Sequence, residues 1–325
     1  MMIKRIKNHI SSVQENGIYL SLAKTLYRLS FRQPMPTFAG RILCEERLLR
    51  YLEKYKYTII PYEIERVVNE LQKEDSSSHS NKVWCYWAQG EDMPEIVKVC
   101  VSSQKRMFKK IDGWEYVFLT DENINQYISL PHEIMEKQRK GFITRTHFSD
   151  ILRLALLERY GGIWIDSTVF LSTTREHALS IVDVISEPLF FIKAPITGMV
   201  VRNASNWIIK ADAHNAIIVA MYRMLIEYWK NERYVRDYFL FHICLRYIVD
   251  SDEYFRSQWD SIPYHDDSNC NYLRICMNEQ YVDDKWRQIK DMTGIHKLNW
   301  KEPYTTYIDG EKETFYYSLL NGKLL

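Results

Sequence analysis

The chain has 325 residues, of which 46% are hydrophobic and 14% aromatic, and its formal net charge at pH 7 is +1. This length accommodates one large domain with an appendage, or two domains. Because the net charge is close to zero, it gives no electrostatic argument for binding nucleic acid, and we expect no such partner.

The six cysteines form no C-x-x-C pair and no zinc-binding spacing. Free, buried thiols in a reducing compartment explain this pattern most simply. No apolar run reaches the roughly 18 residues that a membrane span needs, and the N-terminus lacks a signal-peptide core. We therefore expect a cytoplasmic protein.

Residues 1–73 are predicted to be mainly helical. Residues 1–32 carry six basic side chains against one acidic side chain, Glu15, and their apolar residues recur at helical spacing. Such a segment can lie on an anionic membrane surface as a peripheral contact. It can equally be a helix that covers the main domain. Two further helices are predicted, over residues 40–55 and after Pro61.

A polar, serine-rich run follows this helical region and is the best candidate for a domain boundary. We predict a helical region over residues 1–73, a linker over 74–81, a main domain over 82–310 and a C-terminal tail over 311–325.

The main domain opens with a predicted strand over residues 82–88, a helix from Pro94 to about residue 110, and a second strand over 114–119. This order predicts a parallel sheet with right-handed crossovers. Further along, we predict strands over 188–191 and 206–210, and helices over 214–230 and 234–249.

The most informative segment runs from His147 to Thr168. Its first part is a predicted helix with a broad apolar stripe, in which Ser149 or Asp150 can cap the first turn. Two glycines, 161 and 162, suit a left-handed helix end, and a short apolar strand over 163–165 follows.

Asp166 leaves this strand at its carboxyl end, where open α/β sheets bind their ligands. Asp150 and Arg153 lie near the start of the preceding helix. The three side chains can therefore face one crevice, which is the layout of a nucleotide site.

This segment resembles the S-D-x-x-R and G-G-x-aromatic-x-D region of retaining glycosyltransferases of the GT-A type. It is most similar to the bacterial capsular polysaccharide synthesis group related to glycosyltransferase family 32, over roughly residues 82–301. The separation of Asp150 from Asp166 also resembles that in the large clostridial glucosylating toxins. The resemblance implies an α/β fold, a Rossmann-like GT-A domain, here with an N-terminal helical extension.

Most of these relatives carry Asp-x-Asp, whereas this chain reads Asp166-Ser167-Thr168. The resemblance implies Mn²⁺ or Mg²⁺ bound by Asp166, and His296 as a second metal ligand. One carboxylate cannot hold either cation alone. Lys297 and Lys301 would contact the diphosphate of the donor.

For the donor nucleotide, the resemblance places Trp87 and Gln89 against the base. Asp150 would accept hydrogen bonds from uracil or ribose, and Arg153 would contact the diphosphate or the sugar. Trp164 would lie against the ribose or fill the core, and both interpretations stay open.

Two later clusters also resemble the capsule group. Asn206 would bind hydroxyls of the donor sugar. In the D-Y-F-L-F-H run, Asp237 would touch the donor sugar or accept the acceptor proton. Asp237 and His242 are five residues apart, so one helix would not align them, and we expect one of the two to be structural.

The resemblance therefore implies a retaining transferase that moves a hexose from a UDP-sugar to a lipid-linked oligosaccharide of a capsular or surface polysaccharide. The alternative is a non-catalytic relative that binds nucleotide sugars or glycans and acts as a scaffold in the assembly complex. The missing second Asp motivates this alternative.

Overall fold

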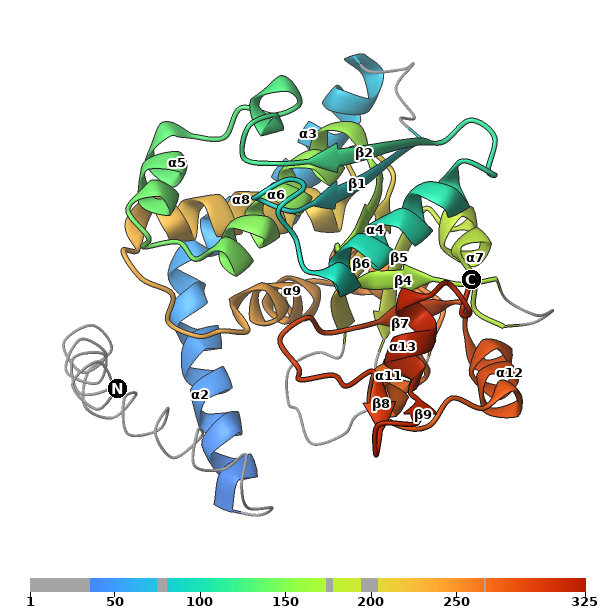
Figure 1. Ribbon diagram of the computed structural model, residues 1–325. Coiled ribbons are helices and arrows are strands. Elements are labelled where there is room, and N and C mark those ends of the chain that lie inside the picture. Colours follow the sequence, from blue (N-terminus) through green and yellow to red (C-terminus); the bar gives the residue numbers. More distant parts are fainter. Residues whose placement is uncertain (1–35, 75–80, 174–177, 194–203, 266) are drawn as a thin grey trace.

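The computed structural model describes residues 36–74, 81–173, 178–193, 204–265 and 267–325 (Figure 1). The basic segment over residues 1–32 lies outside this part of the chain. Its membrane contact and its alternative, a covering helix, both stay predictions.

A five-stranded sheet forms the centre of the molecule, in the order β2-β1-β3-β6-β5 (Figure 1). β1 pairs in parallel with both β2 and β3, which confirms the predicted parallel unit. β6 is antiparallel to β3 and to β5, so the sheet as a whole is mixed. The strands span Lys82–Tyr86 (β1), Glu115–Leu119 (β2), Gly162–Ile165 (β3), Leu189–Lys193 (β5) and Ala204–Ala211 (β6).

Helices cover both faces of this sheet because consecutive side chains of the central strands β1 and β3 are apolar and point to opposite faces. In β1, Trp84 and Tyr86 belong to the core shared with helices α6 and α8, whereas Cys85 packs with residues of α4 on the other face. These helices span Glu95–Phe108 (α4), Arg145–Tyr160 (α6) and Ala216–Asn231 (α8). The result is a mixed α/β architecture with a two-sided sheet.

A short second ribbon joins distant parts of the chain. β4 (Val169–Leu171) pairs antiparallel with β7 (Ile295–Lys297), so residues about 130 positions apart in the sequence lie side by side. Figure 1 shows β7 grouped with the other C-terminal elements at one end of the molecule. These are α11 (Asp267–Cys276), α12 (Asp283–Met292), β8 (Tyr307–Ile308), β9 (Lys312–Glu313) and α13 (Phe315–Leu320).

The remaining elements include one longer helix, α9 (Leu240–Ser251), which packs against α8 and α2 (Pro36–Leu52), and several short ones. The short ones are η2 (Ile124–Gln126), α5 (His132–Arg139), α7 (Ile181–Ser186) and α10 (Glu253–Asp260). α9 begins six residues later than the predicted helix over 234–249. The oxygen Oδ1 of Asp237 accepts a hydrogen bond from the backbone N–H of Phe239, at 2.8 Å, and so holds a turn in front of the helix.

The described part of the N-terminal region is helical, as predicted. It comprises α2 (Pro36–Leu52), the 3-10 segment η1 (Glu53–Ile59) and α3 (Pro61–Glu74). Leu48, Leu52 and Ile64 are buried in the same hydrophobic cluster as α8 and α9. A domain boundary near residue 74 stays a prediction, but these helices share their core with the main domain.

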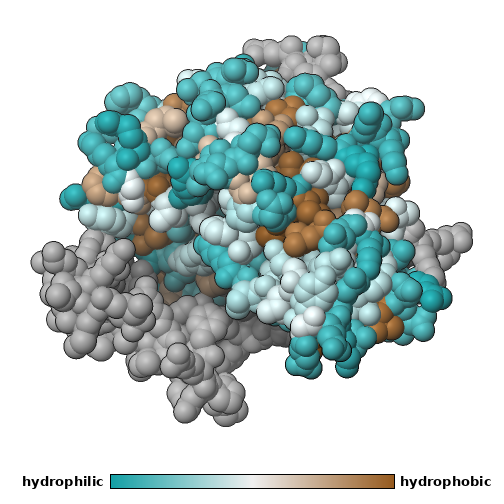
Figure 2. Space-filling model, in the orientation of Figure 1, coloured by the Kyte–Doolittle hydropathy of each residue, from teal (hydrophilic) through white to brown (hydrophobic). Residues whose placement is uncertain are grey.

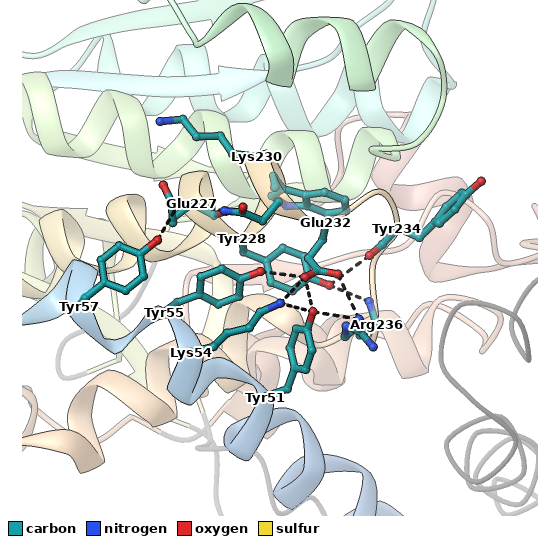
Figure 3. A network of polar contacts seen from close by, with 12 residues as sticks. Tyr51, Lys54, Tyr55, Tyr57, Glu227, Tyr228, Lys230, Glu232, Tyr234 and Arg236 are labelled. Carbon is teal, nitrogen blue, oxygen red and sulfur yellow. Dashed lines mark hydrogen bonds and ion pairs between the residues drawn. The ribbon is translucent and has the colours of Figure 1, made fainter.

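A polar network fastens η1 and the end of α2 to the end of α8 (Figure 3). The carboxylate of Glu232 accepts hydrogen bonds from Tyr51, Tyr55 and Lys54, the last two at 2.8 and 2.6 Å, and Arg236 lies 3.2 Å away. Burial opposes ionisation of Glu232, but these donors outweigh it and lower its pKa to about 2. The network therefore keeps a charged, paired carboxylate under the N-terminal helices.

The surface of the face in Figure 2 is mainly hydrophilic, and its apolar side chains gather in small separate areas. Among the helices of the described residues, none combines the length and apolar character that crossing a bilayer requires.

Helix α6 differs from its prediction at its N-terminus and agrees with it in part at its C-terminus. Thr144 caps α6 by accepting a hydrogen bond from the backbone N–H of His147, so Ser149 and Asp150 lie in the second turn and neither caps it. The predicted cap was wrong because a suitable oxygen precedes it by five residues. At the other end, Gly161 terminates α6 with the predicted positive φ, of 65°, but its ψ of −156° lies outside the left-handed helical region.

We expect Gly161→Ala to destabilise the protein by about 3 kcal/mol or more, because a Cβ there would lie 2.5 Å from the backbone nitrogen of Ala213, in a conformation that only glycine adopts readily. Gly141 also has a positive φ, of 75°, but its added Cβ would meet nothing within 4 Å. The matched change Gly141→Ala should cost about 1 kcal/mol. Urea midpoints measure both, and equal losses would contradict this account.

Candidate functional site

Asp166 lies at the carboxyl end of β3, where its backbone is held on two sides. Its N–H donates to the carbonyl of Trp207 in β6, at 2.8 Å, and its own carbonyl accepts from Val169, at 3.0 Å. The side chain is 27% exposed. The carboxylate is therefore fixed at the sheet edge but reachable from solvent.

Arg153 of α6 lies between Asp166 and a second carboxylate. Its Nη2 is 3.3 Å from Oδ1 of Asp150 and 3.6 Å from Oδ1 of Asp166. The guanidinium is nearly fully buried, and the rings of Trp164 and Phe241 lie 5.0 and 5.6 Å from it. A buried guanidinium needs partners of this kind, and here it has two carboxylates and two aromatic faces.

Asp150 is buried and has one further partner. The amide nitrogen of Asn206, in β6, donates to its Oδ1 at 3.0 Å. Burial raises the pKa of Asp150 to about 6; the charge of Asp166 adds to this rise, whereas Arg153 and Asn206 oppose it. The predicted residues Asp150, Arg153, Asp166 and Asn206 thus form one contiguous cluster, which we call the carboxylate cluster.

Lys297 reaches this cluster from the β4–β7 ribbon. Its Nζ lies 3.2 Å from Oδ2 of Asp166 and donates a hydrogen bond to the hydroxyl of Thr168. Burial opposes ionisation of Asp166, but the charges of Lys297 and Arg153 and the hydrogen bonds from Trp164 and Lys297 lower its pKa overall. The structure therefore brings the predicted diphosphate-binding lysine to Asp166.

His296 faces the other side of β7, because neighbouring residues of a strand point in opposite directions. Its Nε2 lies 2.8 Å from the hydroxyl of Ser172, and its ring packs against Phe170 and Trp286. Burial lowers the pKa of His296 to about 3. The structure does not bring this predicted metal ligand to Asp166.

The donor set at Asp166 fits a divalent cation poorly. Oδ1 accepts the indole N–H of Trp164 at 2.9 Å, and Oδ2 is paired with Lys297. Thr168 is also engaged by Lys297. Within the described ranges, no group of three or more His, Cys, Asp or Glu side chains is arranged to hold a metal ion. A cation at Asp166 stays an expectation from sequence that these contacts do not favour.

Residues 41–319 match the family described as capsular polysaccharide synthesis protein. The chain belongs to this family. The match begins inside α2, so the N-terminal helices that share the main core are part of the family's common region.

Two individual relatives can be compared with this capsular polysaccharide synthesis protein. The "O-glycosyltransferase PaGT" of Phomopsis amygdali is 29% identical over 140 residues, which are 39% of this chain and 33% of that protein. The chain therefore spans about a third of this curated relative's length. The solved structure of "PaToxG Glycosyltransferase" superimposes with a TM-score of 0.35 and 12% identity, over 61% of this chain and 83% of that one. This likeness is too low to support an argument about fold.

An aromatic pair lies where the chain leaves the carboxyl end of β1, which is the parallel neighbour of β3. The rings of Trp87 and Trp300 are 5.7 Å apart at 82°, and Trp300 follows Lys297 by three residues. Trp84 is in the core on the opposite face of the sheet. Gln89 and Lys301 are both exposed, and Nζ of Lys301 lies 5.3 Å from the centre of the Trp300 ring.

Trp164 supports the cluster from inside the core. It is 1% exposed, and its indole N–H and ring contact Asp166 and Arg153. Of the two interpretations that the sequence leaves open, this burial favours the core.

The segment before α9 contributes a residue that the sequence analysis missed. Tyr238 is 65% exposed, and its ring lies 6.0 Å from that of His147 in α6. Asp237 supports the turn before α9, and burial and the charge of Arg153 lower the pKa of His242 to about 4. Nothing in the D-Y-F-L-F-H pattern distinguishes Tyr238, since its exposure depends on where α9 begins.

We expect the stability difference between wild type and Asp150→Asn to depend on pH. Between about pH 4 and 6 the unfolded chain ionises Asp150 while the folded protein keeps it protonated, so wild type loses stability as pH rises. The loss approaches about 3 kcal/mol and is complete above pH ~6, because two pKa units correspond to about that free energy.

Urea unfolding at about pH 4, 5.5 and 7 measures this difference. The free energy of unfolding of Asp150→Asn should rise relative to that of wild type from pH 4 to pH 7. The exposed Asp284→Asn controls for the loss of a surface carboxylate. Curves of wild type and Asp150→Asn that run parallel across the series would contradict the assignment.

Proposed function

We propose that this capsular polysaccharide synthesis protein is a retaining glycosyltransferase that moves a hexose from a UDP-sugar to a lipid-linked oligosaccharide acceptor. Family membership supports sugar transfer in polysaccharide synthesis, and the similarity to an O-glycosyltransferase supports a transferase. The observation that carries the proposal is the pairing of two cationic side chains, Arg153 and Lys297, around Asp166 at the sheet edge.

The chemistry of transfer explains why positive charge is needed at this edge. The bond between the anomeric carbon and a diphosphate oxygen breaks, and its electrons stay on the diphosphate. The acceptor hydroxyl forms the new bond to the anomeric carbon and gives up its proton, which a leaving phosphate oxygen can take. Negative charge therefore accumulates on the diphosphate, and fixed positive groups aimed at it lower the barrier.

The other side chains fit donor recognition. Trp87 and Trp300 offer an aromatic wall for the base at the carboxyl end of β1. Asp150 and Asn206 carry carboxylate and amide groups that suit the hydroxyls of ribose and of a sugar. Most of their hydrogen-bonding capacity is already used within the carboxylate cluster.

We further propose that the enzyme works in the cytoplasm, with residues 1–32 as a peripheral contact to the inner face of the membrane. The motivation is the basic, amphipathic composition of that segment. A lipid-linked acceptor would be presented at the same surface.

A second candidate function is donor binding without turnover, as part of an assembly complex. The observation that favours it is the engagement of both Asp166 oxygens and of Thr168 by protein donors. The two functions differ in one respect only, which is whether the donor is ever cleaved.

A panel of nucleotides and nucleotide sugars, scored by thermal shift with and without Mn²⁺, tests the proposal. A ligand that binds only the folded state raises the melting temperature by mass action, so no acceptor is needed. We expect UDP and one UDP-sugar to raise it by a few degrees and guanine or adenine nucleotides to have no effect. The lack of any shift would contradict both candidate functions.

Slow hydrolysis of the UDP-sugar that binds then separates the two candidates. The transferase should release UDP, and Asp166→Ala should reduce this rate about a hundredfold or more while the protein stays folded. Binding with no release under any condition would favour the scaffold.

A further inference from the structure

The ammonium of Lys297 lies in space between the side chains of Asp166 and Thr168, the first and third residues of the Asp166-Ser167-Thr168 motif. Its Nζ contacts the carboxylate of Asp166 at 3.2 Å and the hydroxyl of Thr168 at the same time. The side-chain oxygens of Asp166 and Thr168 thus both contact one cation, which is the ammonium of Lys297.

The backbone fixes this lysine in place. Lys297 is paired with Val169 in the β4–β7 ribbon, and the next residue, Leu298, donates its N–H to the carbonyl of Thr168 at 2.9 Å. The motif and the lysine are therefore held by the same short ribbon. An ammonium placed in this way needs little reorganisation when a ligand arrives.

The ammonium also retains access and donor capacity. Its side chain is 22% exposed and that of Asp166 27%. A lysine ammonium has three N–H donors, of which Asp166 and Thr168 take two, so one remains for a ligand. Arg153, on the other side of Asp166, is almost fully buried. Lys297 is thus the member of the cation pair that a diphosphate can reach.

We propose that the ammonium of Lys297 takes the place of the divalent cation, and that this protein binds the diphosphate of its donor without a metal ion. This inference rests on the proposed function of the same site. When the anomeric carbon–oxygen bond breaks, the electron pair stays on the diphosphate and Lys297 stabilises it by charge and hydrogen bonding, keeping its own proton throughout. Asp166 and Thr168 then position the ammonium.

The test is the affinity of the full-length protein for UDP and for uridine, measured by calorimetry after exhaustive treatment with EDTA and again with added Mn²⁺ or Mg²⁺. We expect the UDP affinity of wild type to change by less than about twofold between these conditions. A drop of about tenfold or more on chelation, reversed by either metal, would overturn the inference.

Lys297→Met provides the second arm, and Lys312→Met, an exposed lysine in β9, is the matched control. Loss of one charge-assisted hydrogen bond should weaken UDP binding by Lys297→Met about ten- to a hundredfold. Uridine lacks the diphosphate, so its affinity should stay within about twofold. Unchanged UDP affinity in Lys297→Met would overturn the inference.

If Lys297→Met does not fold, the chelation experiment on wild type decides the matter alone. Failure of wild type to bind UDP or any UDP-sugar in either condition would overturn the proposed function, and this inference with it. Binding that requires a metal would overturn only the inference and leave the transferase proposal standing.

Discussion

The buried guanidinium of Arg153 is the interaction on which the site depends. A charge in this position is tolerated only because Asp150 and Asp166 lie 3.3 and 3.6 Å away and because its other donors reach backbone and hydroxyl oxygens. Those partners come from α6, from the end of β3 and, through the carbonyl of Asn206, from β6. Removing either carboxylate or one of these oxygens would leave a buried donor unpaired, so the guanidinium links the three elements that shape the sheet edge.

The second constraint is the ribbon that returns the C-terminal part of the chain to this edge. Without the pairing of β4 with β7, Lys297 would have no fixed place beside Asp166. The same return brings Trp300 against Trp87. The two carboxylates differ in environment as a consequence. Burial raises the pKa of Asp150, whereas at Asp166 burial is outweighed by the charges of Lys297 and Arg153 together with the hydrogen bonds from Trp164 and Lys297, so that pKa is lowered. Groups with such opposed shifts are typical of functional sites.

Much of this arrangement was predictable because it is local. Asp150 and Arg153 are three residues apart on a helix with an unmistakable apolar stripe, and Asp166 directly follows a short strand, so their proximity follows from helix and strand geometry. The choice between His296 and Lys297 was not predictable, since which side of β7 faces Asp166 depends on its register with β4. The start of α9, and with it the exposure of Tyr238, depends on a turn made by Asp237. The role of Trp300 depends on a partner more than two hundred residues earlier.

A crystal structure of the protein with bound UDP would test the central claim most directly, namely that the sheet edge around Asp166 is a nucleotide-diphosphate site. The account predicts the diphosphate within hydrogen-bonding distance of Nζ of Lys297 and the uracil beside Trp87 and Trp300. UDP bound elsewhere, for example in the groove that Glu46, Tyr57 and Arg246 line between α2, η1 and α9, would contradict it.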